Sequence, residues 1–301
     1  MLEDVESICS VESGFSHNLF LDHDGNVYSC ALKPTRISGL PKIISVAASF
    51  DKHSLFLDEE HCVWACGELP LGKLKKNNLA PVKLPINPMK SITAGWRHSL
   101  FLDEEGTPWV CGNNNWGELG LGDNKRRSKA QKVENLPCIK EIFAGCQHTM
   151  FLGEDGSVWG TGYNSTGELG SNKKGIVKPV RIDGLPEIKM IALGWNHSLF
   201  LDLSGGVWAC GSNSKCQLGM NNRHRLSVLE PELLPNLPEI QMIAAGGTHS
   251  LFVDVENSLW ACGSNDRNQL GNTNCDIPQM VANVPKVRVH RKHETKSARN
   301  V

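Results

Sequence analysis

The chain has 301 residues and a formal net charge of −1, with 31 basic against 32 acidic residues. This balance excludes a whole-molecule preference for nucleic acid or for acidic ligands, so any such preference must be local. No segment reaches the ~18 consecutive apolar residues of a membrane span, and the amino terminus is acidic where a secretory signal would be basic and then apolar. We therefore predict a soluble, intracellular protein of the cytoplasm or nucleus, without a membrane span.

One motif recurs six times along the chain. It reads HSLFLD in its most regular form, and a cysteine or, once, a threonine follows thirteen residues after its histidine. The histidines are His17, His53, His98, His148, His197 and His249, at intervals of 36, 45, 50, 49 and 52 residues. A catalytic constellation is normally unique in a chain, whereas recurrence at a near-constant period indicates a structural repeat. We therefore interpret these histidines as hydrogen-bonded structural residues at the starts of strands.

Each unit predicts four short strands, as the third unit shows. Residues 89–94 have apolar spacing and end before Gly95, and the continuous apolar run SLFL follows at 99–102. The turn at 103–106 suits a hairpin with a positive φ at its glycine, and PWVCG at 108–112 is the third strand. A loop of the form GxNxxGELG then leads to a short fourth strand. The fourth segments end in Leu-Pro or Val-Pro turns at Pro41, Pro85, Pro137, Pro186, Pro238 and Pro285.

Four strands in 45 to 50 residues are typical of a propeller blade. We predict an all-β protein, a β-propeller of six four-stranded antiparallel blades, with seven blades as the alternative if residues 287–289 add a strand to an incomplete closing blade. The single domain is expected at residues 1–289, and a basic, disordered tail at 290–301. Because SLFL has no polar alternation, both faces of that strand should be buried between blades. The aromatic residues expected in this core are Phe20, Phe56, Phe101, Phe151, Phe200 and Phe252, with Tyr28, Trp64, Trp109, Trp159, Trp208 and Trp260.

Eleven cysteines at first suggest a disulfide framework. Five of them occupy one equivalent repeat position, however, and the chain has no C-x-x-C pair. Identical positions in successive units are spaced like units and not like bonded pairs. We therefore predict small buried thiols in a reducing compartment, with no metal site and no cofactor.

The pattern GxxHSLFLDxxGxVWxCGxNxxGELG resembles the regulator-of-chromosome-condensation repeat over residues 5–285. The resemblance implies a β-propeller, and the founding member of the family is a seven-bladed exchange factor for the small GTPase Ran. Its relatives also include ubiquitin-ligase modules, a plant UV-B photoreceptor and enzyme inhibitors, so the fold is implied more specifically than the activity. The founding protein displaces nucleotide with a hairpin wedge in its third blade. The corresponding stretch here has ordinary length, so a wedge-driven mechanism is not expected.

Acidic and basic residues fall into different turns of the predicted blades. In an antiparallel blade the first and third turns emerge on one face and the second turn on the other. The second turns are acidic, and the third loops are basic in four successive units, which predicts an electrically bipolar disc. Exposed aromatic and arginine side chains on the basic face have the composition of a protein-binding site; the alternative is that the aromatics cap the core. The predicted partner-binding residues are Phe15, Trp96, Arg97, Trp116, Arg126, Arg127, Trp195, Arg223 and Arg225.

The sequence contains no nucleophile elbow, phosphate-binding glycine loop or metal-ligand spacing, so we predict no catalytic residues and no substrate-converting enzyme. The leading hypothesis is a monomeric interaction propeller that binds a small GTPase, or another acidic protein surface, and promotes nucleotide exchange by steric and electrostatic displacement. The alternative is a non-catalytic adaptor or a scaffold associated with chromatin or nucleic acid, which KRRSK at 125–129 and the basic tail favour. A bacterial source would place the protein in a host cytoplasm. Light sensing is a remote hypothesis, because GWRHS occurs in full only at 95–99.

Overall fold

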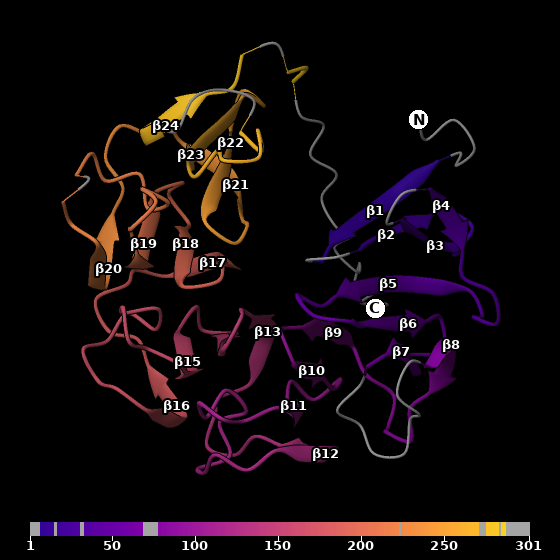
Figure 1. Cartoon of the computed structure of the whole chain (residues 1–301). Helices are drawn as coiled ribbons and strands as arrows, with labels where there is room; N and C mark the ends of the chain where they lie inside the picture. The colour runs from indigo at the N-terminus through magenta and orange to yellow at the C-terminus, as the bar shows by residue number, and fades with distance from the viewer. Residues whose placement is uncertain are drawn as a thin grey trace, which may run out of the picture.

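The computed structural model describes residues 7–14, 17–30, 33–68, 78–222, 224–270, 275–282 and 284–286. It is an all-β structure of six four-stranded sheets, each built from four strands that follow one another in the chain and pair antiparallel. The sheets succeed one another around a ring (Figure 1). The prediction of a six-bladed β-propeller is therefore confirmed. The alternative closing strand at 287–289 and the tail at 290–301 lie outside the described residues.

The strands of the first three blades are β1 (Ile8–Ser13), β2 (Asn18–Asp22), β3 (Val27–Cys30), β4 (Pro34–Arg36), β5 (Ile43–Ala48), β6 (His53–Asp58), β7 (Val63–Gly67), β8 (Asn78–Lys83), β9 (Ser91–Ala94), β10 (His98–Leu102), β11 (Pro108–Gly112) and β12 (Arg127–Lys132). Those of the last three are β13 (Ile139–Ala144), β14 (His148–Gly153), β15 (Val158–Gly162), β16 (Ile176–Arg181), β17 (Ile188–Leu193), β18 (His197–Asp202), β19 (Val207–Ser212), β20 (Ser227–Leu233), β21 (Ile240–Ala245), β22 (His249–Asp254), β23 (Leu259–Gly263) and β24 (Cys275–Met280).

The first strand of each blade lies nearest the axis of the ring. Strand β5 contacts β9, β9 contacts β13, and β17 contacts β21, so the first strands of neighbouring blades meet one another. The fourth strands therefore form the outer rim. Because successive strands are antiparallel, the first turns and third loops open on one face of the disc. The second turns and the crossovers between blades open on the other.

The core lies at the junctions between blades. In each junction, leucine or methionine side chains of one blade pack against a phenylalanine and an aliphatic residue of the next. At the junction of the second and third blades, Leu55 and Leu57 of β6 pack with Ile92 and Phe101 of the next blade. All six residues of β6, and likewise of β14 and β18, are buried, as the unbroken apolar run predicts. Each buried phenylalanine removes on the order of 150 to 250 Å² from water, so these junctions dominate the stability of the ring.

The second turns of five blades are held by an aspartate at their first position, and the fourth blade has Gly153 there. Asp103 accepts the backbone N–H of Thr107 at 2.7 Å through Oδ1 and the indole N–H of Trp109 at 2.8 Å through Oδ2. The same indole bond recurs in three other blades, as Asp58–Trp64 at 2.7 Å, Asp202–Trp208 at 3.0 Å and Asp254–Trp260 at 2.9 Å. The aromatic column is consequently half-buried: its rings pack against the core clusters while their polar edges stay at the turns. Its assignment to the core was thus only partly right.

The predicted glycine of the second turn has a positive φ, as at Gly106 with 75°. Where glycine is absent, His61 and Asn257 adopt the same region with φ of 62° and 67°. The turn geometry is thus kept in every blade, although two of these residues carry a side chain in the left-handed region, where a side chain is unfavourable.

The first blade differs from the others at its outward side. Phe20 is half-buried, whereas the five phenylalanines at the equivalent position are fully buried. In the ring, this side of the first blade faces the last blade, and the ribbons of β1 and β21 stand apart there, a gap that we call the opening (Figure 1). The prediction that Phe20 lies in the core was therefore wrong, because its burial requires a preceding blade against it.

Within the described residues, no helix is long and apolar enough to cross a membrane, and no three His, Cys, Asp or Glu side chains are grouped as metal ligands would be. The cysteines whose side chains are described are free thiols. At the shared repeat position, burial raises the pKa of the Cys111 thiol to about 12.

Candidate protein-binding face

The repeat histidines link each blade to the next. In five of the six blades, the imidazole Nε2 lies within hydrogen-bond distance of the hydroxyl that follows the histidine of the next blade. The pairs are His17–Ser54 at 2.9 Å, His53–Ser99, His98–Thr149 and His197–Ser250 at 3.1 Å, and His148–Ser198 at 3.4 Å. The sequence shows the histidines but not these partners, because each bond spans 37 to 53 residues.

The hydroxyl hydrogens fix the protonation of these rings. Thr149, Ser198 and Ser250 donate to backbone carbonyls at 2.7, 2.6 and 2.6 Å. Their oxygens must then accept from Nε2–H of His98, His148 and His197, so these three rings carry a hydrogen on Nε2. Burial lowers the pKa of His53 and His148 to about 4 and that of His98 and His197 to about 3. We call these four the buried relay histidines. Neutral, buried rings in four junctions support a structural role and give no one blade a general base.

The predicted binding residues belong to what we call the first-turn face. It is formed by the first turns, at 49–52, 95–97, 145–147, 194–196 and 246–248, and by the third loops, at 113–126, 163–175, 213–222, 224–226 and 264–268. The opposite side, made of the second turns and crossovers, is the second-turn face. Phe15 and Arg223 lie outside the described residues.

Trp96 and Arg97 form one stacked unit at the first turn of the third blade. The guanidinium carbon of Arg97 lies 5.0 Å from the centroid of the Trp96 ring, within the range of a cation–π interaction. Its Nε donates to Asp51 of the preceding blade at 2.8 Å. The arginine side chain remains 58% exposed, so it can contact a partner, but one side of its charge is already compensated.

Trp195, at the corresponding turn of the fifth blade, is partly packed and partly exposed. Its ring lies against Gly247 of the next blade, so closely that a Cβ there would come within 2.7 Å of the indole. The backbone N–H of Trp195 donates to the backbone carbonyl of Gly247 at 3.2 Å, and 36% of the residue is exposed. One face of the indole thus caps a blade junction while the other is available on the surface. The two sequence interpretations of this tryptophan, core cap and binding residue, are compatible.

Trp116 gains a partner that sequence reasoning missed. It is 45% exposed in the third loop of the third blade, and Tyr163 of the next blade meets it edge to face with ring centroids 4.9 Å apart. Its backbone N–H donates to the buried Glu118 at 2.8 Å, which fixes the loop beneath it. Tyr163 follows the last residue of β15, where Asn113 stands in the third blade. An aromatic residue directly after the third strand of the blade was the sequence feature that could have indicated this contact.

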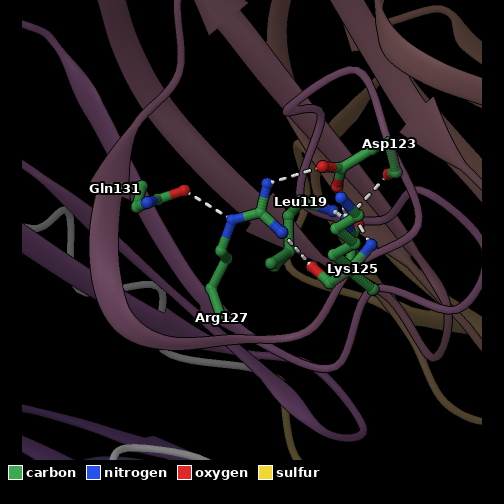
Figure 2. Close-up of polar contacts among 6 residues, drawn as sticks. Leu119, Asp123, Lys125, Arg127 and Gln131 are labelled. Atoms are coloured by element: carbon green, nitrogen blue, oxygen red, sulfur yellow. Dashed lines mark hydrogen bonds and ion pairs between the residues drawn. The ribbon is translucent and has the colours of Figure 1, made fainter.

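The predicted arginines divide into engaged and available side chains. Figure 2 shows Arg127 held by Asp123 at 2.9 Å, by Gln131 at 2.5 Å and by the carbonyl of Lys125. Arg225 makes a bidentate pair with Glu232 at 2.7 and 2.5 Å. Arg126 is exposed and makes no ion pair or side-chain hydrogen bond with the described residues.

Exposed basic residues of the third loops and exposed acidic residues of the second turns lie on opposite faces, and Lys42, 3.2 Å from Glu59, adds positive charge to the second-turn face. On the first-turn face, Lys125, Lys173 and Lys174 are exposed beside Arg126. On the second-turn face the leading aspartates are buried, or half-buried at Asp103, and are bonded within their turns, so the exposed negative charge comes from the residues that follow them. These residues are Asp24, Glu59, Glu60, Glu104, Glu105, Glu154, Asp155 and Glu256.

A family model for the RCC1-like domain matches residues 1–298. The chain belongs to the RCC1-like domain family. Two crystal structures of the yeast protein RCC1 (Prp20), one of them in complex with Kap60, superpose on this RCC1-like propeller with a TM-score of 0.82 at 25% identity. They cover 92% of this chain and 75% and 77% of the yeast chains. Human WBSCR16, 18% identical, gives a TM-score of 0.81 over 92% of this chain and 83% of its own, which shows the shared fold.

A curated relative, an RCC1 repeat-containing protein of Schizosaccharomyces pombe, is 41% identical over 44 residues. That match spans 15% of this chain and 12% of the relative. It supports the repeat and carries no activity with it.

Proposed function

We propose that this RCC1-like propeller binds a small GTPase of the Ran type through its first-turn face and promotes nucleotide release. The observation that carries the proposal is the grouping, on one face, of exposed aromatic surface at Trp116 and Trp195 with Arg126, a cation that has no ion pair with the described residues. Aromatic anchors with a cationic rim are the composition of a protein-binding hot spot. The yeast protein Prp20p, a structural neighbour, is described by its binding to Gsp1p and histones.

The geometry supports division of labour within this face. Trp96, Arg97 and Trp195 stand on first turns, which lead from the innermost strands, whereas Arg126 directly precedes the rim strand β12. Partly buried aromatics near the axis supply apolar contact area, and cations at the rim attract an acidic partner before contact is made. We expect substitutions near the axis to change the dissociation rate and substitutions at the rim to change the association rate.

The third loop of the third blade sets a limit on the exchange mechanism. Residues 113–126 consist of turns and bends, with no strand pair projecting from the blade. A wedge that enters the nucleotide site is therefore not available from this loop. Exchange on this propeller would depend on the contacts of the face as a whole, which stabilise the nucleotide-free form of the GTPase relative to its nucleotide-bound form.

The test is release of a fluorescent GDP analogue from a Ran-type GTPase, with binding measured in parallel on the nucleotide-free form. Trp195→Ala should weaken binding about 30-fold, as for a hot-spot residue worth ~2 kcal/mol. Arg126→Glu should slow association about tenfold. Leu203→Ala is the matched control, because this 58% exposed residue lies on the second-turn face. Equal binding by all three variants would move the site away from the first-turn face.

Chromatin association is the second candidate, favoured by the exposed Lys125, Arg126 and Lys129 at the rim of the third blade. Binding to DNA through such residues is dominated by phosphate contacts and should fall steeply between 50 and 200 mM salt. A response to salt that is flat over this range would remove this candidate.

A further inference from the structure

The opening between the last and the first blade exposes two faces that are buried at every other blade junction. On the first blade, Val11 pairs with Phe20 across β1 and β2 and is 52% exposed. The residues in the same register of the other blades are at most 8% exposed; they are Val46, Ile92, Ile142, Ile191 and Ile243. On the last blade, Leu251 is half-buried, whereas Leu55, Leu100, Met150 and Leu199 are fully buried.

The hydrogen-bond relay stops at the same place. His249 of the last blade sits over Gly246 as His98, His148 and His197 sit over their glycines, yet its ring has no hydrogen-bond partner among the described residues. At the far side of the opening, the position that carries a hydroxyl in the other five blades is Asn18. The opening is therefore an incomplete sixth junction. It has the surface of the last blade and the surface of the first blade, and neither is covered by a neighbouring blade.

The five complete junctions show what fits against such a surface. In every case, the side of a blade that carries the repeat histidine and leucines packs against the first two strands of the next blade. The second of these strands carries a hydroxyl residue and, two positions later, a phenylalanine. The hydroxyl bonds to histidine Nε2, and the phenylalanine packs with the leucines, as Ser99 and Phe101 do on the second blade.

We propose that the opening is a docking site for a β-hairpin of a partner protein, with a Ser or Thr two residues before a Phe on the strand that faces His249 and Leu251. The hairpin completes the sixth junction on the last blade, and its other side covers Val11 and Phe20. A second copy of this chain does not fit this description, because its five hydroxyl-x-Phe hairpins are buried in its own junctions. Its one exposed hairpin, in the first blade, has Asn18 in place of the hydroxyl.

The test uses the full chain and a labelled synthetic peptide of residues 43–58, the inner hairpin of the second blade, which contains Ser54 and Phe56. A peptide with Ser54→Ala and Phe56→Asp is its control. Fluorescence anisotropy should show saturable binding of the first peptide only. Leu251→Asp should weaken it at least about tenfold, because a carboxylate then enters the apolar contact. Val255→Asp, at a 50% exposed residue of the second turn, should leave it unchanged.

Val11→Asp keeps the test decisive if Leu251→Asp fails to fold, because Val11 is already half in solvent; it should also weaken binding. Absence of binding, or equal binding by both peptides, would overturn the proposal. So would binding that appears only when Val287 and Val289 are changed to Asp, since residues 287–301 would then be the occupant. Self-association of the wild-type chain that Val11→Asp abolishes would overturn it in favour of a second copy.

Discussion

Removal of a single relay hydroxyl should destabilise the propeller. Ser250 is fully buried. Its hydroxyl oxygen accepts from His197 Nε2 at 3.1 Å, and its O–H donates to the Gln217 carbonyl at 2.6 Å. Ser250→Ala leaves the buried Nε2 of His197 without this partner, and its Nδ1 already has none among the described residues. The Gln217 carbonyl keeps only the Cys262 thiol, a weak donor at 3.4 Å. Each buried polar group without a partner costs about 1–3 kcal/mol. We expect a loss of about 2–4 kcal/mol in the free energy of unfolding.

Urea unfolding at pH 7.5, followed by tryptophan fluorescence and by circular dichroism, measures this loss. Ser128→Ala is the matched control, because it makes the same chemical change at an exposed residue of β12. Ser250→Thr should retain most of the stability, because Thr149 fills the equivalent position in the fourth blade. A loss at Ser250→Ala below about 0.5 kcal/mol, or equal to that at Ser128→Ala, would refute a stabilising relay.

Three further predictions follow from the turns, the histidines and the thiols. Asp202→Ala removes two backbone bonds and the bond to the Trp208 indole, and should lower stability by about 2–4 kcal/mol in urea titrations, while Asp24→Ala at an exposed turn position should change it by less than about 0.5 kcal/mol. The buried relay histidines have folded-state pKa values of about 3 to 4, below the ordinary 6.5, so the unfolded chain binds more protons in acid. The free energy of unfolding should therefore be full above about pH 6.5 and fall toward pH 4 by up to about 1.4 kcal/mol per pH unit for each histidine. A free energy of unfolding that stays constant between pH 7 and 5 would contradict this. The exposed Cys138 should be alkylated in the native protein, whereas Cys111, buried and with a raised pKa, should react only on unfolding, as peptide mass spectrometry would show.

The blade pattern was readable from sequence because it rests on local chemistry. Apolar runs, turn aspartates and positive-φ glycines act within a few residues of one another, so their spacing predicts strands and turns. The bond between the turn aspartate and the indole six residues later was also readable in principle, since Asp103 and Trp109 recur at that spacing. Its importance appears only when the burial of both is known.

The site was harder to predict because its contacts join distant parts of the chain. Arg97 meets Asp51 across 46 residues, and Trp116 meets Tyr163 across a blade junction. Sorting charges by turn predicts that the third loops make one face basic. It could not predict that Arg127 and Arg225 are held within their own blades while Arg126 is available. The half-exposed Phe20 was missed because repeat equivalence assumes that every unit has two neighbours.

A photocrosslink maps the proposed GTPase contact most directly. A photoreactive amino acid placed at Lys125, on the first-turn face, should crosslink to a nucleotide-free Ran-type GTPase. The same group at Leu203, on the second-turn face, should give no product. A crosslink from position 203 with none from position 125 would contradict the assignment of the binding site to the first-turn face.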